Sequence, residues 1–421
     1  MKKIFISLAT AALLFTACSS DENQNTDQTT AGAGSLAFNI ELEDAGKKAA
    51  ATDGMIPITS WDNIKEVQIF LYKKGVGAVD GDIAYSYRLT GAEIAAKADK
   101  KFSWNDIPVG TYDLAVVANL NVSATEKMAM SLDGGVTKTD FTRFNVVGKK
   151  VNSQVMMDLN PSAFPANHTF EAGDKPYSPP TEIFTAYAQD VTITEGVVNT
   201  LGGTLGLKRE VAMMRVRIHK KHPALSTVDF AEADNFIVIH RMPVGFGLKT
   251  QTPAFGGGIF NTASDDNRIM VAATGANTFL SANPASGYKN TNGGAVQILD
   301  ANFTLWRDIM VLPNQTRAEN KLPSANADNA RKYFIVLSAK APANYTLSDG
   351  VTKTTAPTNI YWSGLIEGVF TPNIIREVNL TITSPGGPDN PDGPGTEGGL
   401  EITLGTPEDW NSVVESTHKE I

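Results

Sequence analysis

The sequence predicts an all-β protein built of two β-sandwich domains in series, with small helical insertions. Between residues 35 and 383, stretches rich in Val, Ile, Phe, Tyr and Thr alternate with turns of Gly, Pro, Asn and Asp, which is the pattern of strands and their connections. Helix signals are few. A chain of 421 residues is too long for one typical core and about right for two, so two sandwiches are the simplest arrangement.

The expected strands form two sets, separated by a glycine-interrupted segment at 200–206, which lies within NTLGGTLG at 199–206. This segment places the domain boundary between residues 204 and 205, giving domains 35–204 and 205–383. Two short helices are expected, one after the capping-box pattern that runs from Ser123 to Glu126 and one over 91–98. The strands are expected at 35–42, 64–73, 83–89, 111–120, 154–159, 183–194, 206–219, 235–240, 303–312, 332–339, 359–366 and 374–383.

The first 17 residues have the pattern of an export signal. Lys2 and Lys3 precede an apolar run at 4–15 that is too short to cross a bilayer as a helix. The run ends Phe-Thr-Ala before Cys18, which resembles the lipobox of bacterial lipoproteins, although Phe15 stands where leucine is usual. Cys18, the single cysteine of the chain, is therefore the expected lipidation (palmitate) site, and no intramolecular disulfide can form. The alternative is a plain secretory signal with a chance cysteine.

Residues 18–34 are expected to form a disordered tether between lipid and fold, because they are polar and lack apolar periodicity. The acidic start of this segment, Ser-Ser-Asp-Glu at 19–22, is similar to the tract that sends lipoproteins of Bacteroidales-type bacteria to the outer face of the outer membrane. The whole chain has a formal net charge of -9, which argues against nucleic acid and anionic lipid surfaces as partners.

The sequence holds no convincing catalytic constellation, cofactor motif or metal site. His219 and His222 are three residues apart at a strand end, so their side chains face opposite sides. The glycine runs at 245–247 and 256–258 do not lie between a strand and a helix, as a phosphate-binding loop requires. The five tryptophans could line a sugar platform, but strand aromatics usually belong to the core. A structural or binding role is favoured over an enzyme; the tryptophans are Trp61, Trp104, Trp306, Trp362 and Trp410.

Two strands with the same alternating pattern stand near the two ends of the chain. In the first, the apolar residues are Leu36, Phe38, Ile40 and Leu42; in the second, they are Leu400, Ile402 and Leu404. Each places its apolar side chains on one face and could complete an open sheet edge by β-strand addition. The second strand follows a Gly/Pro-rich spacer that starts at 384. Residues 384–421 are therefore expected to be separate from the folded body and to reach another molecule as a donor strand.

An exchange of these strands requires removal of the first one, and the sequence offers a place to cut. Residues 43–54, EDAGKKAAATDG, are small and polar, as in an exposed loop. A trypsin-like protease that cuts between Lys48 and Ala49 would release residues 18–48 with the lipid and the first strand. Lys47 is an alternative cleavage point, and an ordinary basic surface loop is the alternative interpretation.

Taken together, these motifs make the chain resemble the shaft pilins, or fimbrillins, of the type V pili of Bacteroidales. The resemblance covers nearly the whole chain. It depends on the lipoprotein start and on SLAFNIEL, followed by GKKA. It continues with FSWNDIPVGTYDLAVVANL at 102–120, LKREVAMMRVRI at 207–218, IIREVNLTI at 374–382 and LEITLGTPEDW at 400–410. It implies two transthyretin-like sandwiches, export as a lipoprotein and cleavage near Lys48-Ala49. Lysine stands there where the family usually has arginine, which leaves the identity of the protease open.

The resemblance also implies the partners. The C-terminal donor strand, with Leu400, Ile402, Leu404 and a second anchor near Trp410, would enter the groove of the next subunit. Identical subunits, anchor and tip pilins, a surface protease and the outer membrane are the expected partners of a cell-surface fimbria that supports adhesion. An anchor or tip subunit is a close alternative to the shaft, a surface glycan-binding lipoprotein is the second hypothesis, and a sandwich-fold hydrolase is the third.

Overall fold

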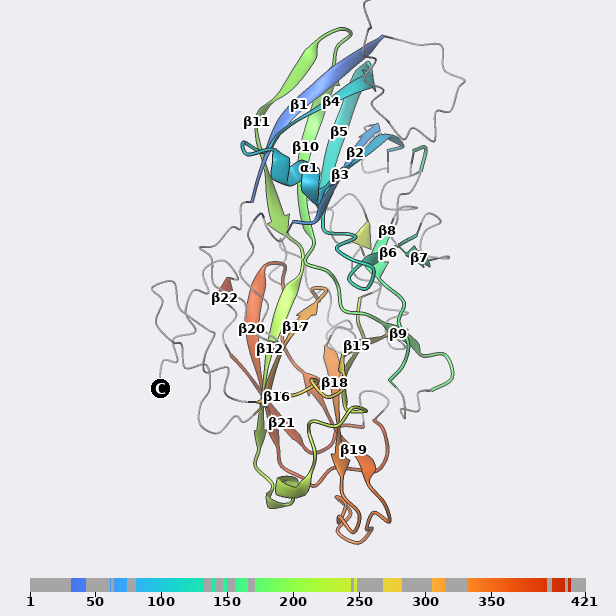
Figure 1. Cartoon of the computed structure of the whole chain (residues 1–421), viewed down its shortest axis with the longest axis vertical. Coiled ribbons are helices and arrows are strands. Elements are labelled where there is room, and N and C mark those ends of the chain that lie inside the picture. Colours follow the sequence, from blue (N-terminus) through green and yellow to red (C-terminus); the bar gives the residue numbers. More distant parts are fainter. Residues whose placement is uncertain are drawn as a thin grey trace, which may run out of the picture.

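A computed structural model of the chain describes residues 32–42, 61, 64–73, 81–131, 138–140, 147–149, 156–165, 171–243, 246–247, 268–281, 305–314, 332–391, 396–405 and 408–409. Within these residues the chain is almost entirely β-sheet, as expected from the sequence. The described residues contain one α-helix, α1 (Gly91–Ala96), and a 3-10 helix at Pro223–Thr227. None of the helices described is long and apolar enough to span a bilayer. Figure 1 shows an N-terminal sandwich stacked on a C-terminal one along the long axis.

The N-terminal sandwich is a seven-stranded sheet folded over on itself, in the order β3-β2-β5-β10-β11-β1-β4. Strands β10 and β11 pair only at Phe184 with Arg209 and at Thr185 with Lys208, so the sheet turns there into two layers. Both layers contribute to one apolar core, which includes Leu36, Val116 and Leu205. The strands are β1 (Ala33–Leu42), β2 (Glu66–Lys73), β3 (Ile83–Thr90), β4 (Lys101–Pro108), β5 (Gly110–Ala118), β10 (Phe184–Ile193) and β11 (Val198–Arg209).

The C-terminal sandwich has a sheet in the order β16-β17-β12-β20-β21 facing a sheet in the order β19-β18-β13-β15-β9. Their inward side chains form the larger core, in which Val216, Ile335, Trp362 and Leu380 are fully buried. Strand β22 (Glu408–Asp409) also pairs with β20. The other strands are β9 (Lys175–Tyr177), β12 (Ala212–Lys220), β13 (Phe236–His240), β15 (Arg268–Thr274), β16 (Leu280–Ser281), β17 (Leu305–Val311), β18 (Tyr333–Ala341), β19 (Thr358–Ile366), β20 (Ile374–Ile382) and β21 (Leu400–Leu404).

A small sheet lies on the flank of the N-terminal sandwich, in the order β14-β8-β6-β7. Its buried residues Met128, Met157 and Leu159 join the core that includes the C-terminal sandwich, so it links the two domains. Its strands are β6 (Met128–Ser131), β7 (Lys138–Asp140), β8 (Met156–Leu159) and β14 (Phe246–Gly247).

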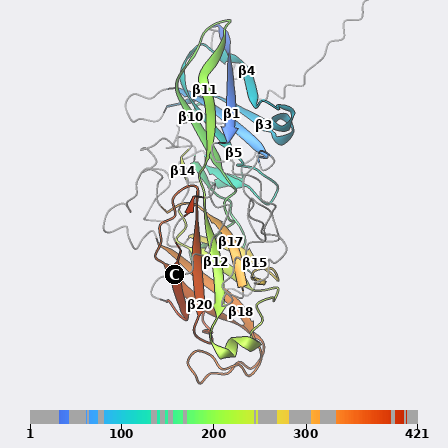
Figure 2. The ribbon, with the colours of Figure 1, turned by 90° about the vertical axis from the view of Figure 1, so that its left-hand side faces the viewer.

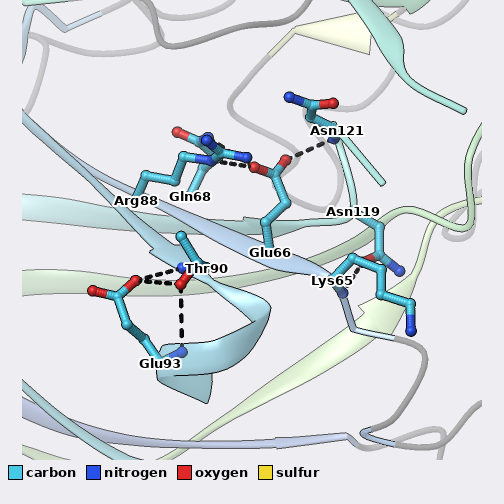
Figure 3. Close-up of polar contacts among 8 residues, drawn as sticks. All are labelled: Lys65, Glu66, Gln68, Arg88, Thr90, Glu93, Asn119 and Asn121. Carbon is cyan, nitrogen blue, oxygen red and sulfur yellow. Dashed lines mark hydrogen bonds and ion pairs between the residues drawn. The ribbon is translucent and has the colours of Figure 1, made fainter. Parts of the chain in front are cut away.

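One expected helix forms and the other does not. Helix α1 begins after Thr90, whose hydroxyl accepts from the backbone of Glu93, while the Glu93 carboxylate accepts from the backbone of Thr90 at 2.7 Å (Figure 3). The predicted helix after Ser123 is wrong. The Ser123 hydroxyl does accept from the Glu126 backbone at 3.0 Å, but the turn closes a bridge and leads into β6, where Met128 is buried. The tertiary site of Met128 outweighs the local capping signal.

The glycines of the segment 202–206 lie at a bulge within strand β11. Ala37 pairs with Thr200 and Asn39 with Thr204, so β11 has two extra residues opposite β1. A bulge of this kind suits glycine. Strand β11 continues to Arg209, and only Glu210 and Val211 separate it from β12.

A buried polar cluster of Arg209, Glu182 and Asn373 joins the domains at this junction. Arg209 is fully buried; its guanidinium donates to Glu182 at 2.9 Å and to the side chain of Asn373, while the Asn373 backbone donates to Val211 O at 2.9 Å. Asn373 directly precedes β20, so the N-terminal sheet is bonded to the start of a C-terminal strand.

Candidate functional site

Strand β1 is the middle strand of its layer. It pairs in parallel with β11 and antiparallel with β4, and the three strands run side by side in Figures 1 and 2. The four predicted apolar side chains all point inward: Leu36 is 0%, Phe38 1%, Ile40 3% and Leu42 8% exposed. The Phe38 ring lies 6.2 Å from that of Phe102, centroid to centroid. The residue alternation of the sequence therefore places this row in the core.

Strand β1 contributes a large part of the stability of the N-terminal sandwich, because its side chains fill a row of pockets and its backbone forms hydrogen-bond ladders with two neighbouring strands. Burial of four side chains of this size is worth about 1.5 to 3 kcal/mol each, and each ladder bond adds about 1 kcal/mol net. Loss of β1 would separate β4 from β11 and leave two unpaired edges over an open core. The N-terminal sandwich therefore needs a strand at this place.

The two ends of β1 differ in how they are held. At its start, Gly32 O accepts from Val109 N at 3.2 Å and Ala33 O accepts from Gly196 N at 3.0 Å. Gly34 has no room for a side chain, because an added Cβ would lie 2.3 Å from Thr194 O. At its end, Leu42 pairs with Leu207. The predicted cleavage point, Lys48-Ala49, and the predicted lipidation site, Cys18, lie outside the described residues.

The C-terminal strand β21 lies on the edge of its own domain. It pairs antiparallel with β20, with Leu400 opposite Ile382 and Leu404 opposite Val378. Leu400, Ile402 and Leu404 are half-buried against the C-terminal core, while Glu401 and Thr403 face solvent. The sequence predicts a tail separate from the folded body; the structure places this tail strand on a sheet of the same chain, because β20 otherwise ends the sheet with a bare edge. Trp410 lies outside the described residues.

Glycines form the surface under the tail. A Cβ at Gly364 would lie 2.6 Å from Ile402 Cδ1, and a Cβ at Gly368 would lie 2.7 Å from Leu404 Cδ1. Both are far closer than real Cβ contacts, so the tail side chains occupy the space that side chains on these residues would take. Gly364 belongs to β19, and β21 therefore closes the gap between β20 and β19.

Polar contacts hold both ends of the tail. Arg376 of β20 donates from Nε to Gly405 O at 3.1 Å and from Nη1 to Val369 O at 3.1 Å, and burial lowers the pKa of Arg376. On the other side, Gly387 pairs with Tyr361 through two backbone bonds of 3.0 Å, and Trp362 Nε1 donates to Ser384 O at 3.0 Å. The first part of the predicted linker is thus bonded to the C-terminal domain.

Strands β1 and β21 are held to different degrees. Strand β1 has four nearly fully buried side chains and two neighbouring strands, whereas β21 has three half-buried side chains and one full neighbour, β20. Since apolar stabilisation scales with the area removed from water, release of β21 costs less than release of β1.

A buried carboxyl group in the N-terminal domain is paired within the fold. The Glu66 carboxylate accepts from Arg88 Nε at 2.5 Å, Asn121 N at 2.7 Å and Gln68 Nε2 at 3.3 Å (Figure 3). Burial raises the pKa of Glu66, and the neighbouring Arg88 opposes that rise. These contacts join the edge strand β3 to β2 and to the residues after β5, which indicates a structural role.

The other candidate residues take structural positions. Trp104, Trp306 and Trp362 are 7%, 2% and 0% exposed and belong to the core, as the sequence favours over a sugar platform. His222 accepts at Nδ1 from Ala224 N at 3.3 Å and so caps the 3-10 helix. Among the described residues, no group of three or more His, Cys, Asp or Glu side chains could hold a metal ion.

The comparisons agree with the predicted resemblance. The model of the family described as fimbrillin-A associated anchor proteins Mfa1 and Mfa2 matches residues 40–238, just under half of the chain. This segment runs from within β1 to within β13 and so includes the junction between the domains. The resemblance to fimbrillins is thereby confirmed over these residues. No curated protein matches the sequence.

Three solved structures extend over most of the chain at low identity. A fimbrilin from Porphyromonas gingivalis W83 is 15% identical, with 89% of this chain and 97% of that one covered and a TM-score of 0.44. A candidate cell adhesion protein from Bacteroides eggerthii is 13% identical, with coverages of 91% and 97% and a TM-score of 0.42. A candidate polysaccharide binding protein from Bacteroides thetaiotaomicron is 10% identical, with coverages of 84% and 94% and a TM-score of 0.39.

Proposed function

We propose, from the premise that residues 40–238 carry the sequence pattern of a fimbrillin-associated family, that the chain is a structural subunit of a cell-surface pilus. The finer proposal is a shaft subunit that polymerises by strand exchange. Removal of β1 opens a groove between β4 and β11, and the C-terminal strand of a neighbouring subunit fills it.

The single observation that carries this proposal is the position of β1. A strand at the start of the fold, central in its layer and buried on its apolar face, can be removed by one cut in the segment that follows it. Cleavage between Lys48 and Ala49 breaks the covalent link between β1 and β2. Strand β1 then loses the high effective concentration that the tether gave it. The groove then has four apolar pockets and two strand edges, on β4 and β11, without backbone partners. A strand with alternating apolar residues can fill the pockets and pair with both edges.

The docked tail supplies the matching donor. Its three apolar side chains, Leu400, Ile402 and Leu404, have the spacing of Leu36, Phe38 and Ile40. Intramolecular docking benefits from a high effective concentration, so the tail stays on its own domain until a deeper groove is open. The greater burial offered by the β1 site then favours the exchanged state.

Exchange of this kind joins the C-terminal region of one subunit to the N-terminal domain of the next. Such a contact is heterologous and propagates as an open filament unless the rotation closes a ring. The proposed route begins with export as a lipoprotein through Cys18, at the outer membrane. It continues with cleavage by a trypsin-like surface protease and ends in a fimbrium with anchor and tip pilins as further partners.

An anchor subunit is the second candidate, because the matching family model is described by its anchor proteins. An anchor would keep β1 and its lipid and would receive no donor strand. The two roles differ in one measurable property, namely whether residues 18–48 remain on the mature protein at the cell surface.

The test is tryptic digestion of the exported full chain, followed by N-terminal sequencing and electron microscopy. A shaft subunit gives a product that starts at Ala49 and forms filaments, and the Lys47→Ala, Lys48→Ala double variant gives neither. Intact monomers after digestion contradict the shaft role.

A matched pair of tail variants tests the donor step. Ile402→Glu places a charge on the apolar face of β21, whereas Thr403→Glu places it on the solvent face of the same strand. Filaments from the Thr403 variant but not from the Ile402 variant support donation by this strand. Equal polymerisation of the two, or full polymerisation of a chain truncated after Thr383, would show that the tail is not the donor.

A further inference from the structure

Exposed apolar side chains gather around the start of β1. Among the described residues, the large hydrophobic side chains that are exposed include Val109 at 41%, Val197 at 47% and Val198 at 64%. Val109 lies in the turn between β4 and β5, and the other two lie where β11 begins. We call these three valines the rim patch.

Hydrogen bonds place the rim patch at the mouth of the β1 groove. Val109 N donates to Gly32 O at 3.2 Å, and Ser35 N donates to Val197 O at 3.0 Å. Val198 pairs with Ser35 in the ladder. The first residues of β1 therefore lie between the two turns that carry the valines, and any strand that replaces β1 has its end beside them.

The opposite pole of the molecule carries an exposed valine on a stiff turn. Val351, 82% exposed, lies in the connection between β18 and β19, at the lower end of Figure 1, whereas the β10–β11 connection lies at the upper end. The Asp349 carboxylate accepts from Val351 N at 2.9 Å and from Thr352 N at 2.8 Å. The hydrogen bond from the Thr352 hydroxyl, followed by these two backbone bonds, lowers the pKa of Asp349.

The Val351 turn is bonded to the root of the tail. Ser348 N donates to Gly386 O at 3.0 Å, and Tyr345 OH donates to Pro385 O at 2.8 Å. From Gly387 to Leu400 the chain can span at most about 45 Å when fully extended. A subunit that inserts its tail strand into a neighbour must therefore keep the pole with the Val351 turn within about 45 Å of that neighbour's groove.

We propose that the rim patch of one subunit docks against the Val351 turn of the subunit whose tail replaces β1, so that the partner is a second copy of this chain. The inference rests on the proposed strand exchange and adds a contact between opposite poles. Both surfaces expose valine side chains on turns that hydrogen bonds fix, so they lose little conformational freedom on contact. The contact is heterologous and repeats at every step of a filament.

The test uses the full chain cleaved with trypsin, with polymerisation followed by light scattering. Val198→Glu and Val351→Glu are each expected to slow filament growth by about tenfold or more, because each puts a charge into an apolar contact. Val147→Glu is the matched control, since Val147 is also exposed, at 47%, but belongs to a segment bonded to Ile83 of β3. Melting curves of the uncut variants check that all three fold.

A charge-pair variant makes the test specific for contact between these two sites. Val198→Glu combined with Val351→Lys is expected to recover most of the growth rate, as a coupled pair does in a double-mutant cycle. If the wild type polymerises and both Glu variants grow like the Val147 control, the rim contact is wrong while strand exchange stands. If the cleaved wild type forms no filaments, the proposed function itself fails.

Discussion

Replacement of Phe38 by alanine tests how much of the N-terminal domain depends on β1. Phe38 is 1% exposed and packs against Phe102, and truncation of a buried phenylalanine costs about 3 to 5 kcal/mol. The next residue, Asn39, points to solvent, so Asn39→Ala is the matched control and should stay within about 0.5 kcal/mol. In the uncut chain, Phe38→Ala therefore lowers the free energy of unfolding of the N-terminal sandwich, measured by denaturant titration.

After cleavage, the same loss of free energy weakens the binding of the β1 fragment to the rest of the domain. Once the chain is cut after Lys48, the fragment that carries β1 is held only by non-covalent contacts, and a loss of about 3 to 5 kcal/mol weakens its retention by roughly 150-fold to 5,000-fold. Under the proposed strand exchange, filaments contain the donor strand in place of β1, so their stability should not depend on residue 38.

The assay is trypsin treatment followed by gel filtration and mass spectrometry of the body and the fragment. The Phe38→Ala fragment should leave much faster than the wild-type and Asn39→Ala fragments, and the filaments of all three should melt alike. If the Phe38→Ala fragment stays bound for as long as the wild-type fragment, or if this variant gives weaker filaments, β1 is not the strand that leaves.

Three further predictions concern other parts of the fold. Gly364→Ala should loosen the tail, because the new Cβ would lie 2.6 Å from Ile402 Cδ1; amide hydrogen exchange over 400–404 should then become faster. Arg209→Ala should cost about 3 to 5 kcal/mol, since it leaves buried partners uncompensated, and should split thermal unfolding into two transitions in calorimetry. Glu66→Gln should flatten the pH dependence of unfolding: burial raises the pKa of Glu66 above 4.5, so wild-type stability falls as the pH rises from 4.5 through the folded-state pKa.

Each of these predictions has a control or an outcome that would contradict it. Gly202→Ala adds a Cβ that would meet nothing within 4 Å and should leave exchange in the tail unchanged; equal exchange in both variants argues against steric docking on Gly364. A single cooperative transition for Arg209→Ala would show that other contacts couple the domains. Glu401→Gln, on the exposed face of β21, should keep the wild-type slope, and retention of that slope in Glu66→Gln would assign it to another group.

Some buried strands, β1 above all, could be predicted from residue alternation. Strands β4 and β15 are absent from the expected set, and the expected strand 206–219 covers the end of β11 and most of β12. The inward row of Leu36, Phe38, Ile40 and Leu42 follows from the period of a strand, because a shift by one residue would move the whole row to the other face. The short helix at 91–96 could also be predicted from local sequence, because Thr90 and Glu93 have the spacing of a capping box.

Long-range features could not be predicted, because they depend on which segments meet. Nothing local distinguishes the glycines at 202–206 as a bulge opposite β1 from a domain boundary. The capping pattern at Ser123 leads into a strand because Met128 has a site in the core. The docking of β21 on β20 depends on Gly364 and Gly368, far from the tail in sequence, which fit its side chains closely.

Cryo-electron microscopy of filaments grown from the cleaved chain shows whether a strand from another molecule replaces β1. We expect density for residues 400–404 of one subunit between β4 and β11 of the next, with no β1 present and β20 of the donor uncovered. Filaments in which β1 still lies between β4 and β11, or in which each tail still lies on its own β20, would contradict it.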